Sequence, residues 1–125
     1  MTLLPDLTQF LADTAKVSVL ITDSSGRIIW ANAGFQRITG YGLPAIRGRK
    51  PGELLQGDDT DPECVRFMGE RIRAGLGFER EVLNYNSAGE PYWVSLEVTP
   101  IKDDAGEVTH FIGIQHDITH LKMAR

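Results

Sequence analysis

The chain has 125 residues, the length of a single domain with a modest core rather than of two domains. Hydrophobic residues make up 42% of it and charged residues 24%, a globular balance that is unlike a disordered or membrane-embedded chain. The formal net charge is −4 and the basic residues are scattered, so we do not expect the domain to bind nucleic acid, which draws on clustered positive charge.

The hydrophobic runs, the first residues and the cysteine count give expectations about location and redox chemistry. No stretch approaches the roughly 18 apolar residues of a spanning helix, and the first residues lack the basic-then-apolar layout of a signal peptide. We therefore expect a cytoplasmic domain that does not interact with membranes. Cys64 is the only cysteine, so neither an internal disulfide nor a CxxC metal site can form.

The first predicted element is an amphipathic helix over residues 4–15, where apolar side chains recur at helical spacing and Pro5 suits a first turn. Residues 17–22 are then typical of a strand, 23–26 of a turn and 27–31 of its antiparallel partner. Frequent Gly and Pro between residues 32 and 57 allow only short helical pieces, for example 33–39.

The second half of the chain predicts one longer helix and a three-stranded meander. Thr60 and Glu63 have the spacing of a capping box, and apolar residues follow at helical intervals, so we predict a helix from about 61 to 75. Three strand-like segments follow, separated by short turns: 83–86, 91–94 and 111–115. The prediction is an α+β fold: a five-stranded antiparallel sheet flanked by short helices, with the first hairpin pairing against the last strands.

Two polar amides interrupt otherwise apolar strand faces in this meander. Asn84 and Gln115 have no evident use in a sheet that only packs, so they predict a sheet that lines a ligand pocket. The alternative for Asn84 is that it satisfies buried backbone groups.

The opposite face of the sheet is predicted to be unusually apolar. If Gln115 points inward, strand alternation turns Ile112 and Ile114 outward. A soluble monomer rarely leaves such a patch bare, so we expect the 4–15 helix to cover it, within one chain or from a second copy in a homodimer. The interface residues predicted on this basis are Leu7, Phe10, Leu11, Trp93, Ile112 and Ile114.

From about residue 17 to residue 119 the sequence resembles a PAS domain, the sensory module of bacterial signalling proteins. The matching pieces are Ile21-Thr22-Asp23, Gly26-Arg27-Ile28-Ile29, Ala31-Asn32-Ala33-Gly34-Phe35, Thr39-Gly40-Tyr41, Gly48-Arg49-Lys50-Pro51, Gly106, Phe111-Ile112-Gly113 and Asp117-Ile118-Thr119. The resemblance implies the PAS fold and three parts: a cap helix at 1–16, the sensor at 17–119 and the start of a linker to an effector domain at 120–125.

Within that superfamily the chain is similar to the flavin-binding LOV branch. The pieces that carry this likeness are Leu54-Leu55-Gln56-Gly57, Thr60-Asp61-Pro62, Leu83-Asn84-Tyr85 and Gly113-Ile114-Gln115. LOV photoreceptors place a cysteine between the Gly-Arg and Leu-Gln elements, where it adds to the flavin after light absorption. The corresponding stretch here, residues 49–56, contains no sulfur, and Cys64 falls on the following helix, so adduct photochemistry is not expected.

The resemblance also implies site residues. Gln56, Arg73, Asn84 and Gln115 match positions that resemble LOV contacts to the phosphate or ribityl side and to the ring edge of the cofactor. Amides suit a ring edge that carries both donors and acceptors. Val94 stands where a second ring-facing asparagine is expected, and Phe78 where flavin-binding redox PAS sensors often carry a tryptophan. Asp117 and Thr119 resemble the junction that relays strain to the following helix; a simple strand end is the alternative.

Three functions remain open. The first is a sensory domain that uses a small ligand, with a flavin (FAD or FMN) as the best candidate. It would be attached to a histidine kinase, to a diguanylate cyclase or phosphodiesterase of cyclic di-GMP signalling, or to a transcription regulator. The second is a cofactor-free module for dimerisation and signal relay. The third is a haem-based gas sensor, which is disfavoured because His110 and His116 fall on the outward face and His120 in the tail.

No catalytic or metal site is predicted. The sequence shows no nucleophile with a base and no paired carboxylates, so any enzyme activity would lie in an attached domain. An acidic run at residues 58–63 precedes the predicted helix, where carboxylates interact favourably with free backbone N–H groups. We expect it to cap the helix rather than to hold a cation.

Overall fold

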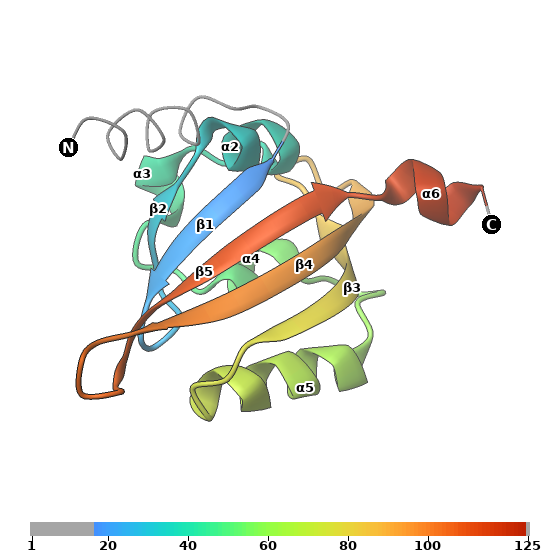
Figure 1. The fold of residues 1–125 in the computed structure, drawn as a ribbon. Coiled ribbons are helices and arrows are strands. Elements are labelled where there is room, and N and C mark those ends of the chain that lie inside the picture. The colour runs from blue at the N-terminus through green and yellow to red at the C-terminus, as the bar shows by residue number, and fades with distance from the viewer. Residues whose placement is uncertain (1–16, 125) are drawn as a thin grey trace.

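The computed structural model describes residues 17–124, which form a sheet with helices packed against it (Figure 1). The strands are β1 (Ser18–Asp23), β2 (Ile28–Ala31), β3 (Phe78–Tyr85), β4 (Pro91–Lys102) and β5 (Val108–Asp117). The helices are α2 (Ala33–Thr39), α3 (Leu43–Ile46), α4 (Pro51–Leu55), α5 (Pro62–Arg73) and α6 (Thr119–Met123).

The five strands form one antiparallel sheet in the order β2-β1-β5-β4-β3. The first hairpin therefore pairs with the last strand of the meander, which confirms the predicted fold class and pairing. β5 lies at the centre, with Gln115 opposite Ser18 of β1 on one side and opposite Leu96 of β4 on the other.

The three hairpins share one turn chemistry. Each begins with an Asp or Asn whose side-chain oxygen accepts hydrogen bonds from the backbone N–H groups two and four residues later. Each also has a glycine three residues on, with a φ of 78° to 89°, a conformation that costs glycine little. The turns are Asp23–Gly26, Asn86–Gly89 and Asp103–Gly106. Because these signals are local, the sequence predicts the hairpins directly.

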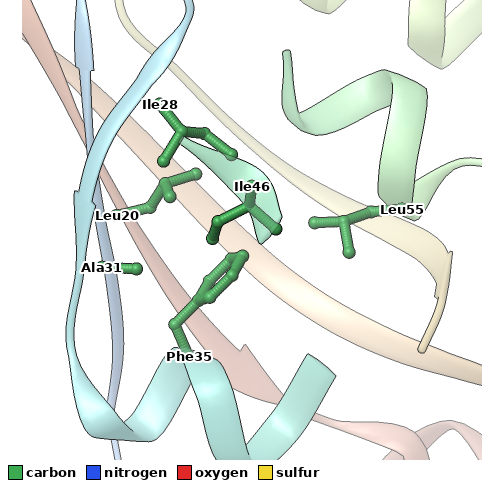
Figure 2. Packing of buried hydrophobic residues seen from close by; sticks show 6 residues of the cluster. All are labelled: Leu20, Ile28, Ala31, Phe35, Ile46 and Leu55. Atoms are coloured by element: carbon green, nitrogen blue, oxygen red, sulfur yellow. The ribbon is translucent and has the colours of Figure 1, made fainter. Parts of the chain in front are cut away.

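The core lies between the sheet and the helices, in two clusters. Figure 2 shows the first, in which side chains of β1 and β2 meet residues of α2, α3 and α4. Its members are Leu20, Ile28, Ala31, Phe35, Ile46 and Leu55. The second cluster joins Met68 of α5 to Val82, Tyr92 and Val94 of the meander. Burial of a side chain as large as Phe35 or Ile46, both 0% exposed, contributes about 1.5–3 kcal/mol.

Some predicted bounds change in the structure. β3 begins five residues before the predicted 83, and β4 extends eight residues beyond the predicted 94. The α5 helix begins at Pro62 with Asp61 as its N-cap, whose carboxylate accepts from the Glu63 N–H. The capping-box interpretation of Thr60 is therefore wrong. The buried Thr60 hydroxyl instead donates to the Leu83 carbonyl at 2.7 Å, and this hydrogen bond joins the loop before α5 to the edge strand β3.

The remaining sequence predictions concern the two ends of the chain. The predicted helix at 4–15 lies outside the described residues. The tail, where the sequence predicts the start of a linker or a longer helix, begins as the short α6 helix. Within residues 17–124 no helix combines the length and the apolar character needed to cross a bilayer.

Candidate functional site

The helix-covered side of the sheet, which we call the inner face, carries four buried polar side chains besides Thr22, whose hydroxyl donates to the Asp23 carbonyl at 2.9 Å. Strand alternation places Ser18 of β1, Asn84 of β3, Tyr92 of β4 and Gln115 of β5 on it, together with core residues. All four are at most 7% exposed. Polar groups this deep are costly unless they are hydrogen-bonded, so their partners decide what this face can do.

These four side chains form two cross-strand pairs. Ser18 lies opposite Gln115, and Asn84 lies opposite Tyr92. Gln115 is level with Leu96 on β4, four residues beyond Tyr92, which corresponds to about 13 Å along the strand. The fully buried Val94 occupies the inner face between the two levels. The amides share one face, as predicted, but only an elongated ligand could touch both.

Three of the four polar groups have an atom without a hydrogen-bond partner among the described residues. These atoms are Ser18 Oγ, Tyr92 OH and Gln115 Oε1. A buried group left in this state costs about 1–3 kcal/mol, and native proteins keep few of them. The hydroxyls can donate or accept, and the glutamine oxygen can accept. A guest with both acceptors and donors along one edge would satisfy all three.

Ser18 and Tyr92 are the two members of this set that the sequence analysis did not predict. Burial raises the pKa of the Tyr92 phenol to about 12, and the neighbouring Asn84 amide offsets part of that rise. The group is therefore a neutral hydroxyl at ordinary pH. The position of Tyr92 two residues before Val94, on the same strand face, was the signal available in the sequence.

The other predicted cofactor residues lie at the margins of the inner face. Phe78 is half-buried and packs edge-on against Phe67 of α5, with ring centroids 6.2 Å apart. Gln56 is half-buried at the end of α4, and its side-chain amide lies over Gly52. Arg73 is exposed in the last turn of α5 and extends along its own helix toward Gly69. The structure brings Asn84, Gln115 and Val94 to one surface but does not bring Arg73 onto it.

The predicted junction residues join the last strand to α6. The Thr119 hydroxyl donates to the Asp117 carboxylate at 2.6 Å and accepts from the Trp93 N–H at 2.9 Å. The Ile118 N–H donates to the Trp93 carbonyl at 2.8 Å. On α6, the Lys122 ammonium lies 4.3 Å from the centroid of the Trp93 ring and 2.9 Å from the Glu81 carboxylate. The start of α6 is thus attached to β4, one residue from Tyr92.

The outer face of the sheet carries the described part of the predicted dimer interface. Trp93, Ile112 and Ile114 are each half-buried there. Leu7, Phe10 and Leu11 lie outside the described residues.

The histidines and acidic residues bear on the haem and metal alternatives. His110 lies on the outer face with its Nδ1 against Thr109 Oγ1, whereas His116 and His120 are exposed. None of the three lies on the inner face of the sheet. Among residues 17–124 no group of three or more acidic, His or Cys side chains is arranged to hold a metal ion.

The structure is an α+β module: an antiparallel sheet whose helix-covered face presents unpaired polar atoms and whose last strand leads directly into a helix. Comparison with known proteins narrows this class. The sequence model described as PAS domain matches residues 16–120. The chain belongs to the PAS domain family.

The similar proteins include light-responsive members of this family. A blue-light-activated histidine kinase of Brucella anthropi is 41% identical over 92 residues, which is 74% of this chain and 18% of that kinase. The chain therefore spans about a fifth of the length of this curated relative.

Two solved structures extend the likeness to the fold. The LOV domain of the Erythrobacter litoralis EL346 blue-light activated histidine kinase is 33% identical with a TM-score of 0.76, over 82% of this chain and 95% of that one. A structure described under "Flavin Analogue Sheds Light on Light-Oxygen-Voltage Domain Mechanism" is 27% identical with a TM-score of 0.81, over 99% of this chain and 90% of that one.

Proposed function

We propose that the chain is a sensory PAS domain that binds a flavin on the inner face of its sheet and controls an attached signalling domain. The observation that carries this proposal is the set of unpaired buried atoms on that face, contributed by Ser18, Tyr92 and Gln115. The likeness to LOV domains of blue-light histidine kinases supports the choice of ligand and output.

A flavin fits the chemistry of this face. Its ring edge carries carbonyl oxygens and ring nitrogens in a row, which is the mixed set of acceptors and donors that the orphaned atoms lack. Its long flat shape suits two polar levels about 13 Å apart along β4. Asn84 and Gln115 would hold the ring edge, with Val94 packing against the ring between them. When bound, the flavin supplies light absorption and redox chemistry; the chain supplies hydrogen bonds and a water-poor environment.

Signal transfer follows from the connectivity of the sheet. Gln115, which would hydrogen-bond to a bound flavin, lies two residues before Asp117 at the end of β5, so a change in the hydrogen bond that Gln115 makes would reach the end of that strand. The hydrogen bonds between Asp117, Thr119 and Trp93 then couple that end to α6. Such a change biases an output only through its differential interaction with two states of the junction.

The output belongs to a domain outside this chain. We infer that catalysis, for example the histidine kinase activity named for the relatives, lies in that attached domain, and that the sensor works in the cytoplasm as a homodimer. The apolar part of the outer face, where Ile112 and Ile114 of β5 are half-buried, supports the dimer. The β3 and β4 part of the same face carries the exposed Glu79, Glu81 and Glu97, and Glu97 lies opposite Ile114.

The test is the absorption spectrum of the protein, purified and then incubated with FMN or FAD. We expect a yellow protein with a structured band in the blue. In that protein Gln115→Leu should shift the band and weaken binding about 5–10-fold, because it removes one hydrogen bond to the ring. A folded protein that stays colourless after incubation would instead establish the cofactor-free relay module, and a Soret band would establish haem.

A further inference from the structure

The inner face contains a polar group that the resemblance to LOV domains does not assign. Tyr92 is 7% exposed, and its hydroxyl makes no hydrogen bond of good geometry with the described residues, although the Asn84 amide is close enough to lower its pKa. The rest of its side chain packs in the second core cluster with Met68, Val82 and Val94. Packing in the core explains why the ring of Tyr92 is buried, but it does not explain why a hydroxyl is buried with it.

The strand register gives this hydroxyl a context. Tyr92 is the cross-strand partner of Asn84 and precedes Val94 by two residues on the same face of β4. Val94 stands where the resemblance to LOV domains implies a second ring-facing asparagine, and its side chain offers only hydrocarbon there. The polar group of β4 nearest to Val94 on this face is therefore the phenol of Tyr92, two residues earlier in the strand and opposite Asn84.

The protonation state of the phenol makes it a donor. Burial holds its pKa at about 12, so it carries its proton throughout the physiological range. A neutral phenol donates one hydrogen bond and accepts another. The Asn84 amide beside it can do both, so the pair can hold a carbonyl oxygen and its neighbouring N–H together.

We propose that Tyr92 is a ligand-binding residue whose hydroxyl donates to an acceptor oxygen of the bound ring and thereby replaces the contact that Val94 cannot make. The inference rests on the proposed flavin function and adds a residue that determines affinity for the ring edge. It also places a ligand contact next to Trp93, the residue that carries the α6 junction.

The variant Tyr92→Phe tests this inference because it removes one oxygen and keeps the ring in the core. In the ligand-free protein it should be neutral or stabilising, raising the melting temperature by up to about 5 °C, since it deletes a buried hydroxyl without a partner. In the flavin-loaded protein it should weaken FMN or FAD binding about 5–10-fold, measured by fluorescence titration. A tyrosine with only a structural role would not give this combination of unchanged or higher ligand-free stability and weaker flavin binding.

Tyr85→Phe is the matched control. Tyr85 is a half-buried tyrosine on the neighbouring strand, and its hydroxyl accepts from the Asp59 N–H at 3.0 Å, away from the inner face. It should leave flavin affinity unchanged and lower the ligand-free melting temperature slightly.

The outcomes separate the inference from the function beneath it. If wild-type protein binds no flavin, the proposed function fails. If wild-type protein binds flavin and Tyr92→Phe binds it equally well, the function stands and the role of Tyr92 is refuted. The role of Tyr92 is also refuted if Tyr92→Phe binds flavin more weakly and at the same time unfolds at a lower temperature than wild type without ligand. That result would show that the hydroxyl stabilises the fold.

Discussion

At the residue scale, Asn32 shows how one side chain fixes the entry to the helical half of the domain. Its Oδ1 accepts from the Val19 N–H at 2.9 Å and the Phe35 N–H at 3.0 Å, and its Nδ2 donates to the Val17 carbonyl at 2.8 Å. The residue is 2% exposed, so water cannot replace these partners. It caps α2 and joins that helix to β1 at once.

We expect Asn32→Ala to lower the free energy of unfolding by about 2–4 kcal/mol, because it removes an N-cap and leaves buried backbone groups unpaired. Asn32→Ser keeps an N-capping oxygen without adding a charge and loses the contact with the Val17 carbonyl, so it should cost less than the alanine variant. Urea denaturation of both variants measures the difference. Equal losses would show that the cap is not what Asn32 supplies.

Tyr92 predicts a stability change at alkaline pH. Its folded-state pKa of about 12 lies above the ordinary value of 10 because burial favours the neutral phenol. The associated stability is therefore fully present below pH 10 and is lost as the pH rises from 10 to 12. Relative to Tyr92→Phe, the ligand-free wild type should lose about 2 kcal/mol across that window. Parallel pH profiles for the two proteins would contradict this assignment.

At the element scale, the junction between β4 and α6 is a discrete connection rather than a strand that merely ends. The Thr119 hydroxyl extends the hydrogen-bond pattern of β4 by one step, because it accepts from the Trp93 N–H. The contact of Lys122 with Glu81 and Trp93 adds a partly exposed ion pair, which contributes about 1 kcal/mol at most. Thr119 is therefore the stronger of the two attachments.

Thr119→Val keeps the shape of the side chain and removes its hydroxyl, so it should raise the exchange rate of the Trp93 amide about tenfold through easier local opening. Hydrogen exchange followed residue by residue measures this. Thr109→Val is the control, since the Thr109 hydroxyl bonds to the Ile101 carbonyl at 3.3 Å in the far hairpin. If the two variants behave alike at Trp93, the junction does not depend on Thr119.

At the scale of the whole molecule, the proposed dimer is the feature that the sheet's outer face predicts. Ile114→Glu replaces an apolar side chain of β5 with a second acidic one opposite Glu97 and should shift the protein toward monomer, as read by light scattering across a range of concentrations. Leu76→Glu is the control, because Leu76 is 43% exposed in the loop between α5 and β3. A wild type that is monomeric at all concentrations would remove the homodimer from the proposal.

The fold could be predicted largely from the sequence because its signals are short-range. The Asp or Asn turns with a glycine three residues on set the hairpins, and the bounds 33–39 predicted for α2 agree with the structure. The PAS family membership and the α+β sheet are confirmed. The cofactor roles of all the predicted site residues stay predictions, since they depend on a ligand and on distances that no local pattern contains: Gln56, Arg73, Phe78, Asn84, Val94 and Gln115.

What the sequence determined by itself is the set of turns, the alternation of strand faces and the family, all of which follow from chemistry within a few neighbouring residues. The tertiary structure alone decided that Thr60 serves the sheet edge rather than the α5 cap, that Arg73 lies off the inner face, and that Tyr92 lies opposite Asn84 with an unpaired hydroxyl. The physical reason is that burial and cross-strand register arise from segments distant in the chain, and only their packing fixes which polar atoms lose water without gaining a partner.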